Sequence, residues 1–278
     1  MIWVLLIVLL LAVFILWLTA PASGRKELRK EFSHRNYAHR GLFGQDQRPP
    51  ENSLPAFAAA VQAGYGMEMD VQFTADRRLV VFHDDSLDRM TGTHGWVRDF
   101  DYEAVCAMPL AGSDEHAPLF SDFLETVSGR TPLIIEIKSR ASYSGAYLDD
   151  LCRAVLDALK DYDGPYCIES FDPRVVHRIR VMAPGVLRGQ LVDSYRSCRG
   201  EGTGRIFAYA MSHCLCNFWA RPDFIAWCPE KENWAIRLCR RLGAMMVMWT
   251  ALPEHDAAKL EQQYDAVIFQ CYRPKTKY

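Results

Sequence analysis

Eight short, apolar, strand-like runs alternate with helix-like segments along this chain, and the alternation limits the possible folds more than any other feature. The runs lie at residues 37–41, 66–72, 132–138, 166–171, 186–192, 224–228, 245–250 and 266–271. Alternating strands and helices are typical of an α/β domain with a parallel sheet. Eight such units predict a closed (β/α)8 barrel, the TIM barrel, with a doubly wound open sheet as the structural alternative. Catalytic groups in such a barrel come from the C-terminal ends of its strands.

Three carboxylates interrupt two of these apolar runs. Glu68 and Asp70 are two residues apart in a predicted strand, so they point to the same face. Adjacent carboxylates repel, and one of them should be protonated unless a cation lies between them. Glu136 adds a third carboxylate and shares a strand face with Lys138. Three carboxylates with no nearby cysteine predict an oxygen-rich site for one hard divalent cation, Mg²⁺ or Ca²⁺.

A ninth strand-like run, residues 79–84, does not fit the parallel pattern. Only five residues, 74–78, separate it from the strand that carries Glu68 and Asp70 when that strand is taken to Phe73. A connection this short permits an antiparallel hairpin, whereas a parallel crossover needs a dozen or more residues. The sequence therefore predicts a small antiparallel hairpin insertion after the second strand, with 79–84 folding back and bringing His83 towards the level of the two carboxylates.

Two histidines and two cations complete the candidate site. His39 and His83 have ordinary pKa values near the operating pH, which suits a general acid and a general base. Arg40 and Lys138 suit an anionic group such as a phosphate. Together with a metal, these residue types predict the cleavage of a phosphodiester.

Five motifs carry the candidate residues: His39-Arg40-Gly41, Glu51-Asn52, Glu68-x-Asp70, His83-Asp84 and Glu136-x-Lys138. As a set they resemble the motifs of the glycerophosphodiester phosphodiesterase family, whose members are PLC-like phosphodiesterases with a TIM barrel. The resemblance implies that the two histidines are the catalytic acid and base and that the three carboxylates bind the metal. It also implies that Arg40 and Lys138 contact the phosphate.

The implied reaction is hydrolysis of a glycerophosphodiester to glycerol 3-phosphate and an alcohol. One histidine would deprotonate the attacking water or a neighbouring glycerol hydroxyl, and the other would protonate the leaving alcohol; the sequence does not assign the two roles. Glu51 is expected to bind the substrate or to orient Arg40. Its alternative role is that of a carboxylate at a helix start, where the helix dipole favours it.

The later motifs follow the family less closely. Ser170-Phe171 and Trp249-Thr250 match, but Ala251-Leu252 replaces an aliphatic-Asn pair, and Gln270-Cys271 stands where an Asp is common. The alternative substrates are lysophospholipids, as in a lysophospholipase D, or more distantly those of a sphingomyelinase-D-like enzyme. An alternative of another class is a non-catalytic, membrane-tethered barrel that binds phospholipid headgroups or a partner protein. Such a chain should have lost a histidine or a metal carboxylate, and none is missing here.

The first segment of the chain is apolar. Residues 2–20 contain no charge and are long enough to span a bilayer. A cleavable signal peptide with Ala20-Pro21-Ala22 as its site is the alternative, but the run exceeds the usual signal core and no Lys or Arg precedes it. The sequence therefore predicts a transmembrane anchor over 1–22, a basic juxtamembrane linker over 23–35 and a catalytic domain over 36–278.

The linker's basic residues predict the orientation of the anchor. Under the positive-inside rule, they hold the catalytic domain on the cytoplasmic side of the cell membrane, as a single-pass protein. The same residues would either touch anionic headgroups or form a solvated linker.

Composition excludes one class of partner and points to one compartment. A net charge of −2 does not favour nucleic-acid binding. Nine cysteines without a disulfide-rich spacing favour a reducing compartment. His213-Cys214-Leu215-Cys216 resembles half of a metal site but lacks a second ligand pair, so packing is the favoured role. The loop-rich region from Ser86 to Pro118 is expected to be a surface connection, with part of a lid or of a collar around the substrate as the alternative.

Overall fold

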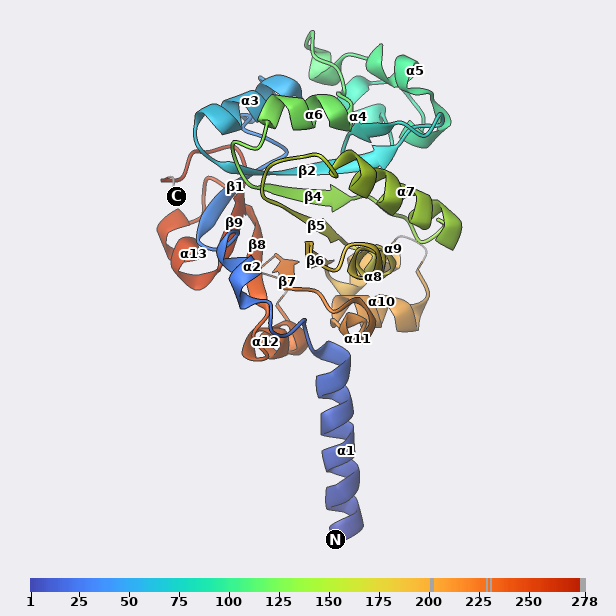
Figure 1. Cartoon of the computed structure of the whole chain (residues 1–278), viewed down its shortest axis with the longest axis vertical. Coiled ribbons are helices and arrows are strands. Elements are labelled where there is room, and N and C mark those ends of the chain that lie inside the picture. The colour runs from blue at the N-terminus through green and yellow to red at the C-terminus, as the bar shows by residue number, and fades with distance from the viewer. Residues whose placement is uncertain (201–202, 229, 231, 276–278) are drawn as a thin grey trace.

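The chain folds into a closed barrel of parallel strands surrounded by helices, and one long helix projects from the barrel domain (Figure 1). The computed structural model describes residues 1–200, 203–228, 230 and 232–275. The barrel strands are β1 (Arg35–His39), β2 (Gly66–Phe73), β4 (Leu133–Ile137), β5 (Tyr166–Ser170), β6 (Leu187–Val192), β7 (Phe224–Trp227), β8 (Met245–Ala251) and β9 (Ala266–Phe269). Their order is β1-β9-β8-β7-β6-β5-β4-β2, and β1 pairs with β2 in parallel to close the ring. The predicted (β/α)8 barrel is confirmed.

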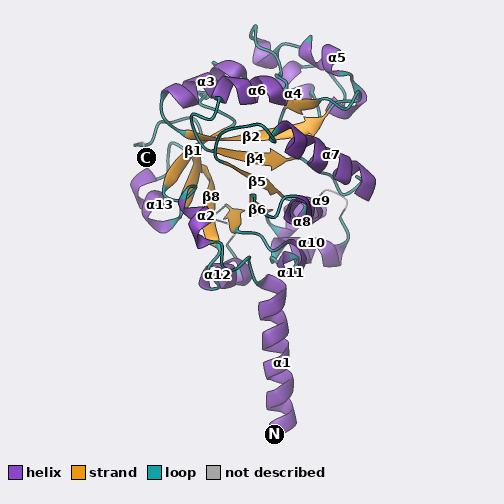
Figure 2. Ribbon diagram, in the orientation of Figure 1, coloured by secondary structure: helices purple, strands orange, loops and turns teal. Residues whose placement is uncertain are grey.

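Helices cover the outside of the strands (Figure 2). They are α2 (Lys26–Lys30), α3 (Leu54–Gln62), α6 (Phe120–Val127), α7 (Gly145–Ala158), α8 (Pro173–Met182), α9 (Tyr195–Gly200), α10 (Arg205–Ser212), α11 (Asn217–Ala220), α12 (Trp234–Arg241) and α13 (Ala257–Gln263). The N-terminal helix α1 (Ile2–Thr19) stands apart from them. Local signals explain several starts: Ser53 caps α3, and Asp172 caps α8 with Pro173 at the first helical position.

The side chains of β2 alternate between the outer core of the domain and the interior of the barrel. Met67, Met69 and Val71 are fully buried and belong to the core cluster between the barrel and its outer helices. Glu68 and Asp70 alternate with them and therefore point to the opposite face, into the barrel. The same strand thus supplies core side chains outwards and carboxylates inwards.

The first barrel strand is shifted from its predicted bounds. The sequence predicts a strand at 37–41, but β1 ends at His39, because Arg40 and Gly41 both have positive φ values, 56° and 85°. This left-handed pair turns the chain out of the sheet towards α3. A Cβ at Gly41 would lie 2.9 Å from Ala56, so the close approach of the loop to α3 requires glycine. His39 consequently lies at the C-terminal end of its strand.

The return strand of the hairpin is antiparallel, as predicted, but shorter than 79–84. β3 (Leu79–Val81) pairs with β2 only as far as Val71↔Val81. Beyond that point, Gln72 Nε2 donates hydrogen bonds to the carbonyl oxygens of Phe82, at 2.8 Å, and Asp84, at 2.9 Å. One more backbone bond follows, from the Phe82 N–H to the Asp70 carbonyl at 3.2 Å, and after it the Gln72 side chain replaces the strand ladder. His83 therefore lies on the loop rather than on the strand.

The region from Ser86 to Pro118, which continues the insertion that begins with β3, is more ordered than the expected surface connection. It forms the short helices α4 (Asp88–Thr91), η1 (Val97–Asp99), α5 (Tyr102–Cys106) and η2 (Leu110–Gly112). These helices bury a small core of their own, with Leu87, Met90 and Val105 among its members. Each helix is too short to show a clear 3.6-residue period in the sequence, which is why a loop was expected.

The interior of the barrel is tightly packed at Gly189 of β6. A Cβ at this position would overlap the Phe224 ring on the neighbouring strand. We expect Gly189→Ala to lower the free energy of unfolding by about 1–3 kcal/mol, because overpacked cores must shift or strain. Thermal unfolding of the full chain in detergent, followed by circular dichroism, measures the effect. Gly185→Ala is the matched control, since a Cβ there meets nothing within 4 Å. Equal midpoints for the two variants would contradict the packing argument.

Candidate active site

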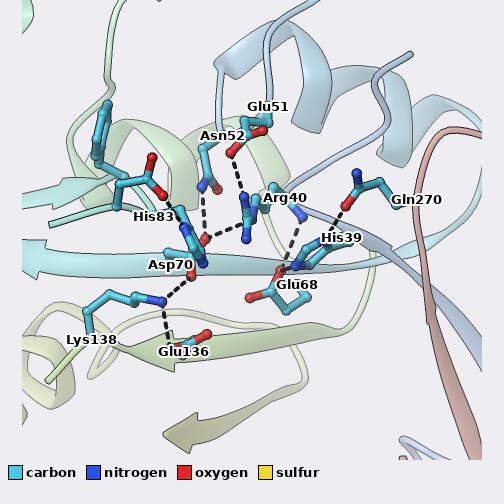
Figure 3. A network of polar contacts seen from close by, with 12 residues as sticks. His39, Arg40, Glu51, Asn52, Glu68, Asp70, His83, Glu136, Lys138 and Gln270 are labelled. Carbon is cyan, nitrogen blue, oxygen red and sulfur yellow. Dashed lines mark hydrogen bonds and ion pairs between the residues drawn. The ribbon is translucent and has the colours of Figure 1, made fainter. Parts of the chain in front are cut away.

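The candidate site lies at the C-terminal ends of β1, β2 and β4 and on the loop after β3 (Figure 3). Strand register brings the residues together: His39 of β1 pairs with Glu68 of β2, and Asp70 of β2 pairs with Glu136 of β4. The structure places all eight residues expected in the site in this one cluster: His39, Arg40, Glu51, Glu68, Asp70, His83, Glu136 and Lys138.

The three carboxylates form a compact group of oxygen atoms. One carboxylate oxygen from each of Glu68, Asp70 and Glu136 lies within 4.8 Å of the other two, and all three side chains are buried. The donor set is all oxygen and strongly anionic, which matches the ligand preference of Mg²⁺ and Ca²⁺. The residues present therefore fit a hard divalent cation.

The pKa values of these carboxyl groups also indicate that the cluster needs a nearby positive charge. Burial, together with the negative charges of Asp70 and Glu136, raises the pKa of Glu68 well above its usual value. Burial also opposes the ionisation of Asp70, but the charges of His83, Lys138 and Arg40 outweigh it and hold the pKa of Asp70 below its usual range. Without a cation, the cluster thus keeps a proton on Glu68, and a bound divalent ion would replace that proton.

Two positively charged side chains border the carboxylates. Lys138 Nζ lies 2.8 Å from Glu136 Oε1 and 3.3 Å from Asp70 Oδ1. Burial lowers the pKa of Lys138, but Glu136 and Asp70 outweigh burial and raise it above its usual value. On the opposite side, Arg40 Nη1 donates to Glu51 Oε1 at 2.7 Å, and its Nε lies 3.6 Å from Asp70 Oδ2. Two charged donors therefore flank the place where an anion would meet the carboxylates.

His39 is held as a neutral imidazole. Its Nδ1 lies 2.6 Å from Gln270 Oε1, and because an amide oxygen only accepts, Nδ1 carries the proton. Nε2 is then unprotonated and faces Glu68, with Oε2 at 3.8 Å. Burial and, after it, the charge of Arg40 lower the pKa of His39 to about 3. A neutral ring with a free Nε2 suits a general base.

His83 has a different environment. Its Nδ1 lies 2.6 Å from Asp84 Oδ1, and Arg89 Nε donates to the other oxygen of the same carboxylate, also at 2.6 Å. Asp84 therefore orients the ring from the loop side. The two histidines approach the carboxylates from different elements, β1 and the loop after β3.

Four partners of the site were missed by the sequence reasoning. Asn52 Nδ2 donates to Asp70 Oδ2 at 2.9 Å, and its motif position beside Glu51 was the available signal. Glu169 of β5 is in register with Glu136, and burial raises the pKa of Glu169 well above its usual value; a carboxyl group within an apolar strand was its signal. Gln270, as a partner of His39, and Arg89, in the insertion, had no such signal.

Glu51 links the two sides of the site. It accepts hydrogen bonds from Arg40 at 2.7 Å and from Arg89 at 2.7 and 3.0 Å. Burial works against its charge, but the bonds from Arg89 and Arg40 outweigh burial and lower the pKa of Glu51 from 4.5 to about 2. The expected role as a partner of Arg40 agrees with this contact.

We expect Glu51→Gln to lower the free energy of unfolding by about 1–3 kcal/mol near pH 7, because a buried charge-assisted network is lost. The folded-state pKa lies below the unfolded one, so the carboxylate stabilises the fold fully above pH 4.5 and loses that effect as pH falls towards 2. The difference between variant and parent should therefore shrink between near pH 7 and near pH 3 in urea unfolding. Glu103→Gln, an exposed carboxylate on α5, is the control. An undiminished difference at acid pH would contradict the pKa.

A cavity of about 490 Å³ opens beside the site. His83, Glu136 and Lys138 line it, with Trp96 contributed by the insertion and Phe171 by the end of β5. The insertion thus forms part of the cavity wall, which agrees with the collar that the sequence offered as the alternative to a surface connection. Phe171 and Trp249 meet edge to face, with ring centroids 5.6 Å apart, so they form an apolar wall at this end of the barrel.

The His213-Cys214-Leu215-Cys216 segment has a packing role. The side chains of Cys214 and Cys216 are buried, and the His213 ring stacks on Tyr209 with centroids 3.9 Å apart. No disulfide joins the cysteines that the structure describes.

Comparison with known proteins gives a consistent result. The model of the glycerophosphoryl diester phosphodiesterase family matches residues 39–269. A glycerophosphodiester phosphodiesterase of Caldanaerobacter subterraneus subsp. tengcongensis is 27% identical over 232 residues, which are 80% of this chain and 88% of that protein. Lysophospholipase D GDPD1 of Rattus norvegicus is 32% identical over 139 residues, which are 44% of this chain and 42% of that protein. The match to the rat enzyme thus spans less than half of its length.

Solved structures share the fold. A phosphodiesterase of Oleispira antarctica, in complex with the product sn-glycerol-3-phosphate, has a TM-score of 0.69 at 22% identity and covers 86% of this chain and 94% of that one. A glycerophosphodiester phosphodiesterase of Thermotoga maritima has a TM-score of 0.61 at 24% identity, over 84% of this chain and 93% of that one.

Proposed function

This chain belongs to the glycerophosphoryl diester phosphodiesterase family, and from that premise we propose that it hydrolyses glycerophosphodiesters to glycerol 3-phosphate and an alcohol. One observation carries the proposal. Two histidines, one neutral and one paired with a carboxylate, approach a buried cluster of three carboxylates, and a lysine and an arginine flank that cluster. These are the groups that phosphodiester hydrolysis needs, namely a base, an acid, a metal site and donors for the phosphate oxygens.

His39 is the proposed general base. Its Nδ1 proton is committed to Gln270, so Nε2 is free to accept the proton of the attacking water. If a neighbouring glycerol hydroxyl attacks instead, the alcohol leaves with formation of a cyclic phosphate, and a water must then open that ring to give glycerol 3-phosphate. His83 is the proposed general acid, which donates a proton to the oxygen of the leaving alcohol. Asp84 holds the His83 ring in position for this transfer. His39 thus takes one proton from the attacking group, and His83 gives one proton to the leaving alcohol, so the total number of protons on the enzyme and its reactants does not change.

Arg40 and Lys138 are proposed to bind the phosphate. Both are charged and both lie against Asp70, so their remaining N–H groups can bind phosphate oxygens as negative charge grows there. Glu51 keeps Arg40 in place. Glu68, Asp70 and Glu136 would hold one divalent cation, Mg²⁺ or Ca²⁺, which supplies Lewis-acid polarisation of the phosphate when it is bound.

A lysophospholipase D activity is the second candidate. Two observations favour it: the similarity to rat lysophospholipase D and the apolar helix α1, which would bring the enzyme to its lipid substrate. Mass spectrometry of products from glycerophosphocholine and from lysophosphatidylcholine separates the two. Glycerol 3-phosphate formed much faster than lysophosphatidic acid supports the first function, and the reverse order supports the second.

We propose that α1 is a retained membrane anchor. It has 18 residues, a mean hydropathy of 3.0 and almost no surface buried against the rest of the chain, and a signal sequence would share these properties. Contacts at its end favour retention: Asn217 Nδ2 donates to the Thr19 carbonyl at 2.9 Å, and Arg221 Nη1 donates to that of Ala20 at 2.8 Å. Cleavage near Ala22 would remove these contacts with the barrel domain.

The basic segment that follows is tied to the barrel domain. Arg25 Nε lies 2.7 Å from Asp223 Oδ1, and Arg29 Nη1 donates to the carbonyl of Gly243. We propose that the catalytic domain lies on the cytoplasmic side, because the basic residues 25–35 follow the anchor.

We expect the protein to remain in the membrane pellet after an alkaline carbonate wash, at the mass of the intact chain. An uncharged span of this length inserts stably into the bilayer, whereas a peripheral protein is released by the wash. Mass spectrometry of the N-terminus decides between anchor and signal peptide. A mature protein that begins near Ser23 and appears in the soluble fraction would contradict the anchor.

A further inference from the structure

Large apolar side chains gather on the outer face of α10. Ile206 is 89% exposed, and Phe207 and Tyr209 are 39% and 44% exposed. The opposite face of the helix, with Ala208 and Ser212, is buried. This helix therefore buries its small residues and presents its large ones. A cluster of this kind on the surface indicates an interaction partner.

The cluster lies at the same end of the barrel domain as α1. Figure 1 shows α10, α11 and α12 at the end of the domain from which α1 projects. Exposed aromatic rings continue around this end. Trp17 of α1 packs on Phe218 of α11 with centroids 4.7 Å apart, and the His213 ring lies between Tyr209 and Trp234 of α12, at 3.9 and 6.0 Å. Trp and Tyr are enriched at the two interfaces of a membrane.

Hydrogen bonds fix α1 to this end of the domain. Besides the bonds from Asn217 and Arg221 to Thr19 and Ala20, the Ala22 N–H donates to the Pro222 carbonyl at 2.8 Å. A bilayer that surrounds α1 would consequently meet the surface formed by α10, α11 and α12. The position of the anchor therefore selects a lipid bilayer as the partner of this surface.

We propose that the exposed face of α10, together with Phe218 and Trp234, is a membrane-contact surface that lies at the boundary of the lipid headgroups and acyl chains. The proposal rests on the proposed anchoring by α1. Shallow insertion of large apolar side chains, with a basic residue such as the exposed Arg205 beside them, is the mode in which interfacial helices bind membranes.

The same helix borders the catalytic cavity. Met211, near the end of α10, lines the 490 Å³ cavity, and it also lines a small cavity that reaches Phe207. The two cavities share Arg140 and Phe171. The membrane-contact surface thus continues into the wall of the active-site cavity. A lipid in the adjoining leaflet would reach the site along α10, so the surface suits a phosphodiester substrate that carries an acyl chain.

Site-specific photocrosslinking of the full chain in phosphatidylcholine–phosphatidylglycerol vesicles tests the surface. The photoreactive residue p-benzoylphenylalanine is placed at one of three positions: 206 on α10, 104 on α5 or 8 on α1. All three are exposed, so the fold should tolerate the change. Position 104 is the control, because α5 lies at the end of the domain opposite α1 (Figure 1).

We expect lipid adducts at positions 206 and 8, and about tenfold fewer at position 104, because only the first two would lie within the lipid layer. Adducts at 206 no more frequent than at 104, or crosslinks from 206 to a second copy of the chain, would overturn the surface. Position 8 reports on the anchor separately. The readout does not depend on turnover, so failure to hydrolyse any phosphodiester would reject the proposed function while adducts at 206 still support the surface.

Discussion

Replacement of His83 by alanine is expected to lower kcat for a glycerophosphodiester by about two to four orders of magnitude. The variant loses the only proposed donor for the leaving alcohol, and alkoxides leave slowly without a proton. The neighbouring Asp84 loses its hydrogen bond to Nδ1 of His83 but keeps the one from Arg89, so the loop should stay in place. The steady-state rate with glycerophosphocholine measures the effect.

His94→Ala is the matched control for this substitution. His94 lies on the same insertion and also pairs with an aspartate, Asp88, but its side chain is 97% exposed and it does not line the cavity. It should therefore retain the parental rate. Near-parental turnover by His83→Ala, in protein with an unchanged unfolding midpoint, would refute the two-histidine scheme.

Replacement of Asp70 by asparagine is expected to weaken divalent-cation binding by at least about 100-fold and to reduce activity accordingly. The change removes one charge from the three-carboxylate cluster, and this is the carboxylate whose pKa its neighbours hold lowest, so it is ionised before the metal arrives. Asparagine keeps the shape and can still contact Asn52, which limits the structural damage. Titration calorimetry with Mg²⁺ and Ca²⁺ measures the affinity.

The control for Asp70→Asn is Glu103→Gln, which removes the same charge from the exposed face of α5. This control should bind the cation as the parent does. Unchanged affinity in Asp70→Asn would place the metal elsewhere. Chelation of the parental enzyme should abolish activity, and added cation should restore it.

Most residues of the site could be predicted because they lie in a strand or follow one closely, whereas Glu51, in the loop before α3, was expected from the resemblance of its motif. Side chains alternate between the two faces of a strand, so Glu68 and Asp70 share one face. The register of the parallel strands then brings Glu136 beside them. The five-residue connection correctly predicted the antiparallel return of the hairpin. Its end could not be predicted, because a side chain, Gln72, takes over the carbonyl groups that a longer strand would have paired.

Residues that enter the site from distant segments were beyond such reasoning. Arg89 reaches Glu51 only because the insertion folds on a core of its own, and no local pattern reveals that packing. Gln270 was noticed only as a departure from an expected aspartate, although it sets the tautomer of His39. The proposed roles of the two histidines rest on these tertiary contacts, which is why the sequence left them open.

The exposed face of α10 shows the same limit. Its apolar residues would be assigned to a buried stripe by periodicity, and only the three-dimensional structure shows that they face outwards, at the end of the domain from which α1 projects.

Phosphorus NMR of the full-length protein in detergent, with glycerophosphocholine as substrate, tests the central claim most directly. With Mg²⁺ or Ca²⁺ present, the diester resonance should be replaced by that of glycerol 3-phosphate, and without a divalent cation it should persist. Conversion that is equally fast after chelation, or no conversion by folded protein that binds the cation, would contradict a metal-dependent glycerophosphodiesterase at this site.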